Sequence, residues 1–448
     1  MQNHPLAAII LAAGKGTRMK SDTHKVLHPI AGRTMLLHLM ASVDALAPAR
    51  TVIVVGDKAE QLRSSVGDRA AIAIQEPQLG TAHAVQQAQG GLSGFIGDVL
   101  ILYGDVPLVP PETMRAMIAR LNGPDTPAIV VLGFRPPEQQ AYGRVIARDG
   151  VIDKMVEYKD ATPEERAETL CNSGLMAVRS VDLFALLARV DNKNAAGEYY
   201  LPDIVMLAAA DGRQSAVIEC AAWEVAGINS RAELAEVEGD WQARRRAQAM
   251  ADGATLAAPE TVWFAHDTII GRDVTIGQNV VFGPGVRVAD QAIIHAFCHI
   301  EGAQISSGAE VGPYARLRPG AVLGEKSKIG NFVEVKKSIF GKGAKANHLA
   351  YLGDGSVGAG ANIGAGTIFC NYDGFDKFDT HVGVGAFVGS NSSLVAPVRI
   401  GDGAYTASGS VITQDVAPNA LGIGRARQED KVGWADRFRT WKQAMRKT

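Results

Sequence analysis

A six-residue repeat organises the C-terminal half of the sequence, from about residue 270 to residue 411. Each unit begins with an apolar residue, often followed by glycine, and continues with mostly small or polar residues. The apolar positions are Ile270, Ile276, Phe282, Val288, Ile294 and Ile300, then, after a slip at Ile305, Val311, Leu317, Leu323, Ile329 and Val335, and later Val357, Ile363, Phe369, Val382, Val388, Leu394 and Ile400. Amphipathic helices repeat near 3.6 residues and half-buried strands near 2, so neither fits. The period predicts a solenoid of triangular coils whose apolar residues point inward.

This repeat resembles that of the hexapeptide transferases. The resemblance implies a left-handed parallel β-helix for residues 253–448, packed as a homotrimer with active sites between subunits. The glycine after the apolar residue, as at Gly271 and Gly277, lets the backbone turn where a Cβ would be strained. The tail from Arg425 onward holds eight Lys or Arg against three Asp or Glu, and we expect it to be mobile and solvated.

The N-terminal half alternates apolar strand patterns with helical ones. Strands are expected at residues 6–13, 51–55, 71–74, 99–103 and 128–133, and helices lie between them, such as 33–46 and 82–89. Such alternation predicts an α/β domain with a Rossmann-like, doubly wound sheet over residues 1–229. In sheets of this kind a ligand binds at the carboxyl ends of the strands.

A linker helix is expected over residues 230–252. Ser230 and Glu233 have the spacing of a capping box, and Gly253 follows the end of the helical pattern. The run of three arginines at 244–246 is interpreted as a solvated face, with a functional basic patch as the alternative.

Composition excludes several classes of protein. The net charge of −2, with 21% charged residues, indicates no basic field for nucleic acid. No apolar run approaches the roughly 20 residues needed to span a bilayer, so no membrane partner is expected. The four cysteines lack a C-x-x-C spacing, which favours a reducing cytoplasm over a zinc site or a disulfide framework.

A glycine loop follows the first strand. Gly14 and Gly16 allow backbone amides to approach an anion, but Met19 stands where a dinucleotide fingerprint needs glycine, and the P-loop pattern is absent. Arg18 and Lys25 supply cations, so the loop suits a nucleoside triphosphate. A tight turn between strand and helix is the alternative.

The motifs around this loop resemble the sugar-nucleotide pyrophosphorylases. They are Leu-Ala-Ala-Gly-Lys-Gly-Thr-Arg-Met at 11–19, Lys-Val-Leu-His at 25–28, Gln-Leu-Gly-Thr at 78–81 and Tyr-Gly-Asp-Val-Pro-Leu at 103–108. The resemblance implies catalytic roles for Arg18 and Lys25, and Mg²⁺ held by Asp105 and Asn229. It implies nucleotide and sugar contacts from Leu11, Ala12, Ala13, Gly14, Lys25, Gln75, Gly80, Thr81, Tyr103, Gly104, Asp105, Gly143, Glu157, Asn172 and Asn229. Taken singly, Asp105 could cap a turn and the Asn and Gly residues could be ordinary loop residues.

Two positions depart from the pattern of that family. Thr23-His24 stands where Leu-Pro is expected, which bears on the stiffness of the loop before Lys25. Ser173 replaces the usual threonine.

The repeat is interrupted at residues 336–352 and 370–381, and function in solenoids tends to reside at interruptions. A lone loop histidine such as His348 is usually structural. Its neighbours, however, include Arg-Leu-Arg-Pro-Gly at 316–320, Gly-Asn-Phe-Val-Glu at 330–334 and Asn-Tyr-Asp-Gly at 371–374. With these motifs the whole chain resembles the bacterial family of bifunctional N-acetylglucosamine-1-phosphate uridyltransferases/glucosamine-1-phosphate acetyltransferases.

That resemblance implies a second site, for acetyl transfer. His348 would be the general base, because an imidazole with a pKa near 6.5 can accept a proton from an amine. Glu334 is a possible orienter of His348. Contacts to sugar phosphate and acetyl-CoA are implied for Arg318, Lys336, Tyr351, Asn362, Asn371, Tyr372, Lys377, Ser390, Ser408 and Arg425.

The sequence therefore predicts a cytoplasmic, homotrimeric, bifunctional enzyme that serves envelope polysaccharide synthesis. It would acetylate glucosamine-1-phosphate with acetyl-CoA, then join N-acetylglucosamine-1-phosphate to UMP from UTP. One alternative is a single-activity sugar-1-phosphate nucleotidyltransferase with a regulatory or oligomerising β-helix. Another is a trimeric scaffold with degenerate sites.

Overall fold

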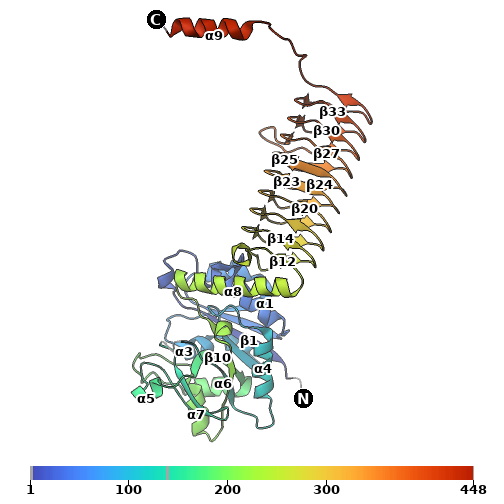
Figure 1. The fold of residues 1–448 in the computed structure, drawn as a ribbon. Helices are drawn as coiled ribbons and strands as arrows, with labels where there is room; N and C mark the ends of the chain where they lie inside the picture. Colours follow the sequence, from blue (N-terminus) through green and yellow to red (C-terminus); the bar gives the residue numbers. More distant parts are fainter. Residues whose placement is uncertain (1–3, 138–140, 447–448) are drawn as a thin grey trace. The chain divides into compact units, whose positions relative to one another are not determined.

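A computed structural model describes residues 4–137 and 141–446 of the chain. It contains two compact units, divided between Arg244 and Arg245, and each is described here by itself (Figure 1). Among the described residues, no helix is both long and apolar enough to cross a membrane.

A nine-stranded sheet forms the centre of the N-terminal unit, in the order β5-β4-β1-β6-β10-β7-β11-β9-β8 (Figure 1). The strands are β1 (Leu6–Ala12), β4 (Arg50–Val55), β5 (Ala71–Ile74), β6 (Asp98–Tyr103), β7 (Ile129–Phe134), β8 (Arg144–Arg148), β9 (Val151–Val156), β10 (Cys171–Arg179) and β11 (Ala216–Cys220). β2 (Pro29–Ile30) and β3 (Arg33–Thr34) form a separate small hairpin. The first five predicted strands are confirmed to within one residue at each end.

Helices cover both faces of this sheet. Alternate residues of the central strands point to opposite faces, so Ile9 packs in one core and Ile10 in the other. The core around Ile9 includes α3 (Thr81–Gln87), α6 (Ser180–Leu187) and α7 (Asp203–Ala210). The core around Ile10 includes α1 (Met35–Asp44), α2 (Ala59–Val66) and α4 (Pro111–Leu121). The predicted doubly wound α/β architecture is confirmed.

The second half of the sheet is mixed, which the sequence did not predict. β10 runs antiparallel to both β6 and β7, while β8 and β9 form a hairpin. Asp149 and Gly150 form its turn with φ of 51° and 76°, the left-handed pair that a tight hairpin requires. The short helix α5 (Pro163–Arg166) follows, capped by Thr162 and Glu165.

The linker pattern forms α8 (Arg231–Ala251), and its capping box is present, with Glu233 N–H donating to Ser230 Oγ at 3.2 Å. The arginine run does not form the solvated face that we expected. Arg244 lies over the Trp223 ring at 4.0 Å and Arg245 over the Phe264 ring at 5.1 Å. Burial lowers the pKa of both guanidinium groups, so they act as packing side chains with amphipathic stems.

The C-terminal unit is a parallel β-helix. One ladder comprises β12 (Thr255–Leu256), β14 (Thr275–Ile276), β17 (Ile293–Ile294), β20 (Glu310–Val311), β23 (Lys328–Asn331), β25 (Lys345–His348), β27 (Asn362–Ile363), β30 (Phe387–Val388), β33 (Tyr405–Thr406) and β35 (Leu421–Gly422). The other two comprise β13 (Ile269–Ile270), β16 (Arg287–Val288), β19 (Gln304–Ile305), β22 (Val322–Leu323), β15 (Val281–Phe282), β18 (His299–Ile300), β21 (Arg316–Leu317), β24 (Glu334–Phe340), β26 (Tyr351–Val357), β28 (Ile368–Cys370), β29 (Thr380–Val382), β31 (Ser393–Val395), β32 (Val398–Ile400) and β34 (Val411–Ile412).

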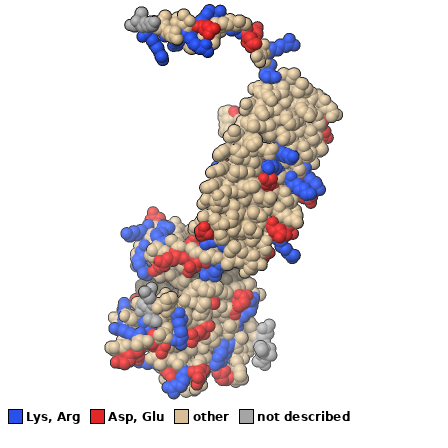
Figure 2. All heavy atoms as spheres, viewed as in Figure 1, with Lys and Arg blue, Asp and Glu red and all other residues tan. Residues whose placement is uncertain are grey.

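Stacked apolar residues fill the β-helix. Ile276, Ile294, Val311 and Ile329 are in register on successive coils, and each is fully buried. The residue before each of them points outward. On the face shown in Figure 2 this unit is mostly uncharged, which reflects the small polar residues of the repeat. The hexapeptide solenoid is confirmed, and its parallel coils are consistent with the predicted left-handed β-helix.

The first predicted interruption is wrong, because the coil continues through residues 336–352. Phe340, Ala346 and Leu352 occupy the inward positions and are buried. The repeat was hidden because Ala346 replaces a larger aliphatic residue, and because β24 and β26 bend around a corner without the usual turn. The second interruption is present as a loop that ends where β29 begins at Thr380.

The tail contains a helix that the sequence analysis did not predict, α9 (Trp434–Met445). All twelve of its residues are exposed, as expected of a solvated segment. The Trp434 and Phe438 rings stack, and the Trp441 ring lies tilted against Phe438.

Candidate active sites

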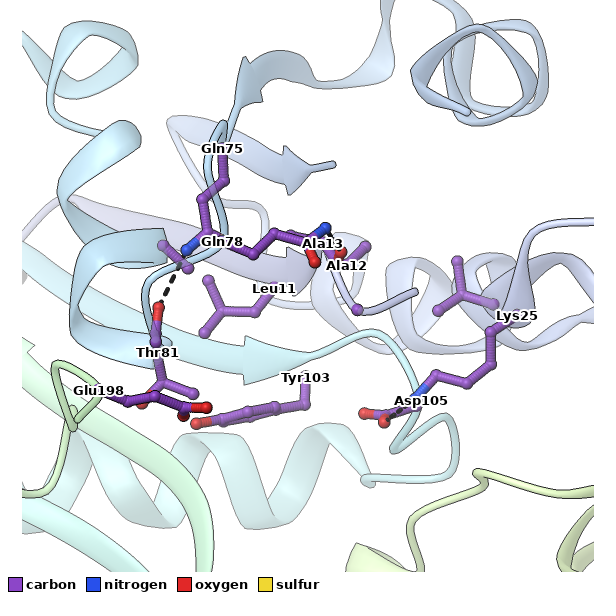
Figure 3. A pocket seen from close by; sticks show the side chains of 14 residues that line it. Leu11, Ala12, Ala13, Lys25, Gln75, Gln78, Thr81, Tyr103, Asp105 and Glu198 are labelled. Atoms are coloured by element: carbon purple, nitrogen blue, oxygen red, sulfur yellow. Dashed lines mark hydrogen bonds and ion pairs between the residues drawn. The ribbon is translucent and has the colours of Figure 1, made fainter. Parts of the chain in front are cut away.

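A cavity of about 360 Å³ lies at the carboxyl ends of β1 and β6 in the N-terminal unit (Figure 3). Its lining residues are Leu11, Ala12, Ala13, Gly14, Lys25, Val26, Gln75, Gln78, Gly80, Thr81, Ala84, Tyr103, Asp105 and Glu198. Most of the residues predicted to contact the nucleotide therefore lie together, and they lie where parallel strands of an α/β sheet present ligands.

The glycine loop brings Lys25 to the cavity. Gly16 has φ of 60°, and a Cβ there would lie 2.7 Å from the Cβ of Lys25, so only glycine allows this approach. A Cβ added to Gly14 would meet no atom within 4 Å beyond its chain neighbours, so that side of the loop is open to a ligand. Arg18, on the short 3₁₀ turn Thr17–Met19, is exposed and does not line the cavity.

Three predicted residues converge at one point of this site. Lys25 Nζ donates to Asp105 Oδ2 at 2.5 Å and to Asn229 Oδ1 at 3.1 Å. Asp105 follows β6 and Asn229 precedes α8, and the N–H of Ile228 donates to the Asp105 carbonyl at 2.9 Å. This backbone bond holds together two segments that are far apart in the sequence.

This donor set fits a magnesium ion. The Asp105 and Asn229 oxygens both point at the Lys25 ammonium, so they already surround a position where positive charge is held. Hard oxygen donors, few from protein and the rest from phosphates, are what Mg²⁺ prefers. Within the described ranges no cluster of three His, Cys, Asp or Glu is placed to bind a metal. A cation here would therefore depend on one carboxylate, one amide and the substrates.

The far side of the cavity region holds the predicted sugar contacts. The N–H of Asn172 donates to the Gly143 carbonyl at 2.9 Å, and a Cβ on Gly143 would lie 3.3 Å from Glu157 Oε2. Burial, with Asp203 nearby, raises the pKa of Glu157. These three residues form one cluster, and their contact with the sugar stays a prediction.

The departure at Thr23-His24 is accommodated by helix α2. His24 is buried; its N–H donates to Gln61 Oε1 at 2.8 Å, and its Nδ1 accepts from the Val26 N–H at 3.4 Å. Gln61 and Lys58 also donate to the carbonyl of Asp22. Burial and the Lys25 charge lower the pKa of His24 to about 4, which keeps its imidazole neutral and able to accept. The loop before Lys25 is thus held by hydrogen bonds in place of a proline ring.

On the β-helix, Glu334 pairs with the predicted phosphate-binding arginine. Arg318 Nη1 donates to Glu334 Oε1 at 2.9 Å, and Arg316 Nη1 lies 3.9 Å from Oε2. Within the described residues, Glu334 makes no hydrogen bond with His348. Glu334 therefore holds the Arg318 and Arg316 side chains in place, and it does not orient His348.

A second cluster surrounds Asp354, which is buried. Lys336 Nζ lies 3.6 Å from Asp354 Oδ2, and Asn371 Nδ2 donates to the same oxygen at 2.5 Å. Tyr351 joins the cluster, its hydroxyl accepting from Asn371 Nδ2 at 3.5 Å. The ammonium of Lys336 lowers the pKa of Lys377, so this second cation lies close to the first. Two predicted residues, Lys336 and Asn371, therefore contact one carboxylate, and Tyr351 and Lys377 lie beside them.

His348 ends β25 and lies at a corner of the prism. Its Nδ1 is 2.6 Å from Asn331 Oδ1, on the preceding coil. Backbone hydrogen bonds link this corner to the corners of the following coils. The N–H of Gly366 donates to the His348 carbonyl, and the N–H of Gly409 donates to the Ser390 carbonyl. His348, Ser390 and Ser408 therefore follow one another along one edge. Asn362, Tyr372 and Arg425 make no side-chain contact with His348 among the described residues.

Comparisons with known proteins identify both units. A family model for the MobA-like NTP transferase domain matches residues 8–250, and one for six bacterial transferase hexapeptide repeats matches residues 267–302. A "Bifunctional protein GlmU" from Sphingopyxis alaskensis is 66% identical over 99% of this chain and 98% of its own length. The proteins of that name from Novosphingobium aromaticivorans and Zymomonas mobilis subsp. mobilis are 68% and 57% identical, each over 97% of this chain and 96% and 98% of their own lengths. The chain belongs to the bifunctional GlmU family.

Sequence reasoning missed several residues of this GlmU-family chain. Gln78 donates to the Ala13 carbonyl at 2.5 Å, and Glu198 lines the cavity. Asp354 and Asn331 contact predicted residues on the β-helix. Asn331 could have been found from the repeat, because one coil spans 17 residues here and places it in register with His348. Glu198 could not, because its segment reaches the cavity only through tertiary contacts.

Proposed function

We propose that the two units of this GlmU-family chain divide two successive reactions. The β-helix acetylates glucosamine-1-phosphate with acetyl-CoA. The N-terminal unit then joins N-acetylglucosamine-1-phosphate to UMP from UTP, forming UDP-N-acetylglucosamine and pyrophosphate. The observation that carries the proposal is the convergence of Lys25, Asp105 and Asn229 at one point beside the glycine loop.

In uridylyl transfer, a phosphate oxygen of the sugar attacks the α-phosphorus of UTP, and both reactants are anions. Bound Mg²⁺, held by Asp105 and Asn229, would supply positive charge to screen this approach and the leaving pyrophosphate. Lys25 reaches the same point, and Arg18 is a second cation on the loop. Such positioned charges account for most of the catalysis of phosphoryl transfer. Tyr103, Thr81 and Gln75 line the cavity for the nucleotide, and Glu157, Asn172 and Gly143 form the cluster for the sugar.

In acetyl transfer, the sugar amine attacks the thioester carbonyl carbon. A C–N bond forms and the C–S bond breaks, so that coenzyme A leaves as a thiolate. His348 takes a proton from the nitrogen and returns it to the sulfur, which gives the free thiol. Arg318 and Lys336 carry the charges that suit the sugar phosphate, and each is held in place by a carboxylate.

The remaining assignments are proposals of the same kind. Asn362, Asn371 and Tyr372 would contact the sugar, while Lys377, Ser390, Ser408 and Arg425 would contact acetyl-CoA. His348 and Ser408 are exposed in the single chain, which supports a site completed by neighbouring copies in a homotrimer. A cytoplasmic location and a role in envelope polysaccharides would follow from the substrates.

A coupled assay tests the division. The protein is given glucosamine-1-phosphate, acetyl-CoA, UTP and Mg²⁺, and free thiol and pyrophosphate are followed separately. Wild type should release both, with pyrophosphate lagging. Asp105→Ala should lose pyrophosphate release and keep thiol release, and His348→Ala should do the reverse once pre-acetylated substrate is supplied. Thiol release at the wild-type rate by His348→Ala would remove His348 as the base.

The alternative, a single-activity nucleotidyltransferase with a passive prism, makes a different forecast. Pyrophosphate would appear only with pre-acetylated sugar phosphate, and no thiol would form. A scaffold with degenerate sites would release neither product.

A further inference from the structure

We infer that Asn331 is the residue that positions the catalytic imidazole of His348. It fixes the tautomer in which Nδ1 carries the proton and Nε2 is the base. This inference rests on the proposed acetyl-transfer function and gives a role to Asn331, a residue of the Gly-Asn-Phe-Val-Glu motif at 330–334 for which the motif alone indicated none.

The contact itself is short and comes from a fixed neighbour. Asn331 Oδ1 lies 2.6 Å from His348 Nδ1, and the two residues are paired in register across β23 and β25. An amide oxygen can only accept a hydrogen bond, so Nδ1 must donate. In a neutral imidazole the other nitrogen, Nε2, then holds the lone pair.

The backbone around both residues is held on each side. The N–H of Leu349, which directly follows His348, donates to the Asn331 carbonyl at 3.0 Å. Leu349 has φ of 52° and Phe332, which follows Asn331, has φ of 55°, so both strands turn the same corner together. The pair therefore forms one rigid step of the ladder, and the imidazole is oriented before a substrate arrives.

The carboxylate expected to orient His348 is engaged elsewhere. Glu334 pairs in register with Tyr351, and its oxygens are taken by Arg318 at 2.9 Å and Arg316 at 3.9 Å. The charged groups on the strands flanking His348 are Lys345 on β25 itself and Lys328 on β23, the latter paired with Glu310 at 2.9 Å. A neutral amide, and not the carboxylate of Glu334, thus orients the base.

Exchange of the amide for a carboxylate separates positioning from simple structural support. Asn331→Asp keeps an acceptor for Nδ1 but adds a negative charge, which favours the imidazolium. The rising limb of kcat/KM against pH for acetyl transfer should move up by about one unit. Above that limb the rate should return close to wild type.

Asn331→Leu removes the acceptor with little change in size. Its kcat should fall about 10-fold to 100-fold with KM nearly unchanged, and the pH limb should stay in place, because only the orientation of the base is lost. Gln278→Leu is the matched control. Gln278 holds a comparable corner position, its carbonyl accepting from Phe297 as that of Asn331 accepts from Leu349, and this variant should behave as wild type.

Three results decide the matter. If His348→Ala keeps acetyl transfer, the proposed function of the site fails. If His348→Ala is inactive while both Asn331 variants match wild type in rate and pH profile, only the positioning role fails. If Asn331→Asp is as slow as Asn331→Leu at every pH, the residue serves packing and the inference is overturned.

Discussion

The ion pair of Lys25 and Asp105 predicts an unusual relation between stability and activity. The two side chains are 9% and 20% exposed, and their charged atoms are 2.5 Å apart. Asp105→Asn removes one charge and keeps the shape, so among the described residues it leaves the largely buried Lys25 ammonium with neutral amide oxygens in place of its charged partner. The added substitution Lys25→Met removes the unpaired charge as well.

The expected loss of unfolding free energy follows from the attraction between the two charges and the opposing cost of their desolvation. At an effective dielectric constant of about 20, unit charges at the separation of 2.5 Å attract by roughly 7 kcal/mol, and desolvation offsets much of this. Removing one partner of a buried pair costs about 3–5 kcal/mol. Because the bond to Asn229 remains, we expect a smaller cost, about 2–3 kcal/mol, for Asp105→Asn. The double variant should lie within about 1 kcal/mol of wild type.

Calorimetry of the full chain measures the change in melting temperature. Because the two compact units need not unfold together, each can give its own transition. The transition that coincides with loss of uridylyl transfer on heating reports the N-terminal unit. For a unit of this size about 1 kcal/mol shifts the midpoint by roughly 2–4 °C, so Asp105→Asn should melt about 4–12 °C lower. Both variants should lose uridylyl transfer by about 10³-fold or more and retain acetyl transfer. A double variant that melts at or below the single one would refute the reasoning.

Three further predictions concern packing, pH and the loop. Ile294→Ala, in the fully buried stack of the prism, should cost about 2–5 kcal/mol and lower the melting of acetyl-transfer activity but not of uridylyl transfer. Burial raises the pKa of Asp203 to about 6. The native state therefore binds more protons than the unfolded chain, and the Asp203 contribution to stability is lost as pH rises from about 4 to 6. Asp203→Asn should raise the unfolding free energy at pH 7 by about 1–2 kcal/mol after allowance for its partial exposure, with no gain at pH 4. Gln61→Ala should raise KM for UTP about 3-fold to 10-fold by loosening the loop before Lys25, and His24→Pro in the same chain should reverse this; no rise in KM would remove the bracing role of α2.

The sequence predicted those parts of the fold that depend on local period. β1 and β4 are mostly apolar runs, which predicted the α/β sheet. Ile276 and Ile294 recur at a fixed spacing, which predicted the β-helix. The antiparallel direction of β10 could not be predicted, because an apolar strand pattern is the same for parallel and antiparallel pairing. The position of β10 between β6 and β7 depends on tertiary pairing. The arginines at 244–246 were misjudged because charge suggests solvent, whereas the Trp223 and Phe264 rings offer a cation–π surface that no local pattern reveals.

The site residues likewise fall into those that a local motif indicates and those that only tertiary contacts reveal. Lys25, Asp105 and His348 were found because their motifs are specific. Asp354 was not, because its value lies in reaching Lys336 and Asn371 at once, and neither distance can be read from a string of residues.

The regular repeat of the β-helix, however, makes some of the residues that the motifs did not indicate predictable. In a coil with a fixed period, residues about one coil apart lie side by side, so register alone places a partner beneath any functional residue. Asn331 lies 17 residues before His348, Glu334 lies 17 before Tyr351, and Asp354 lies 17 before Asn371. The same offset of 17 residues thus places the two members of each pair side by side. A shift of one residue in this stretch would therefore separate all three pairs at once.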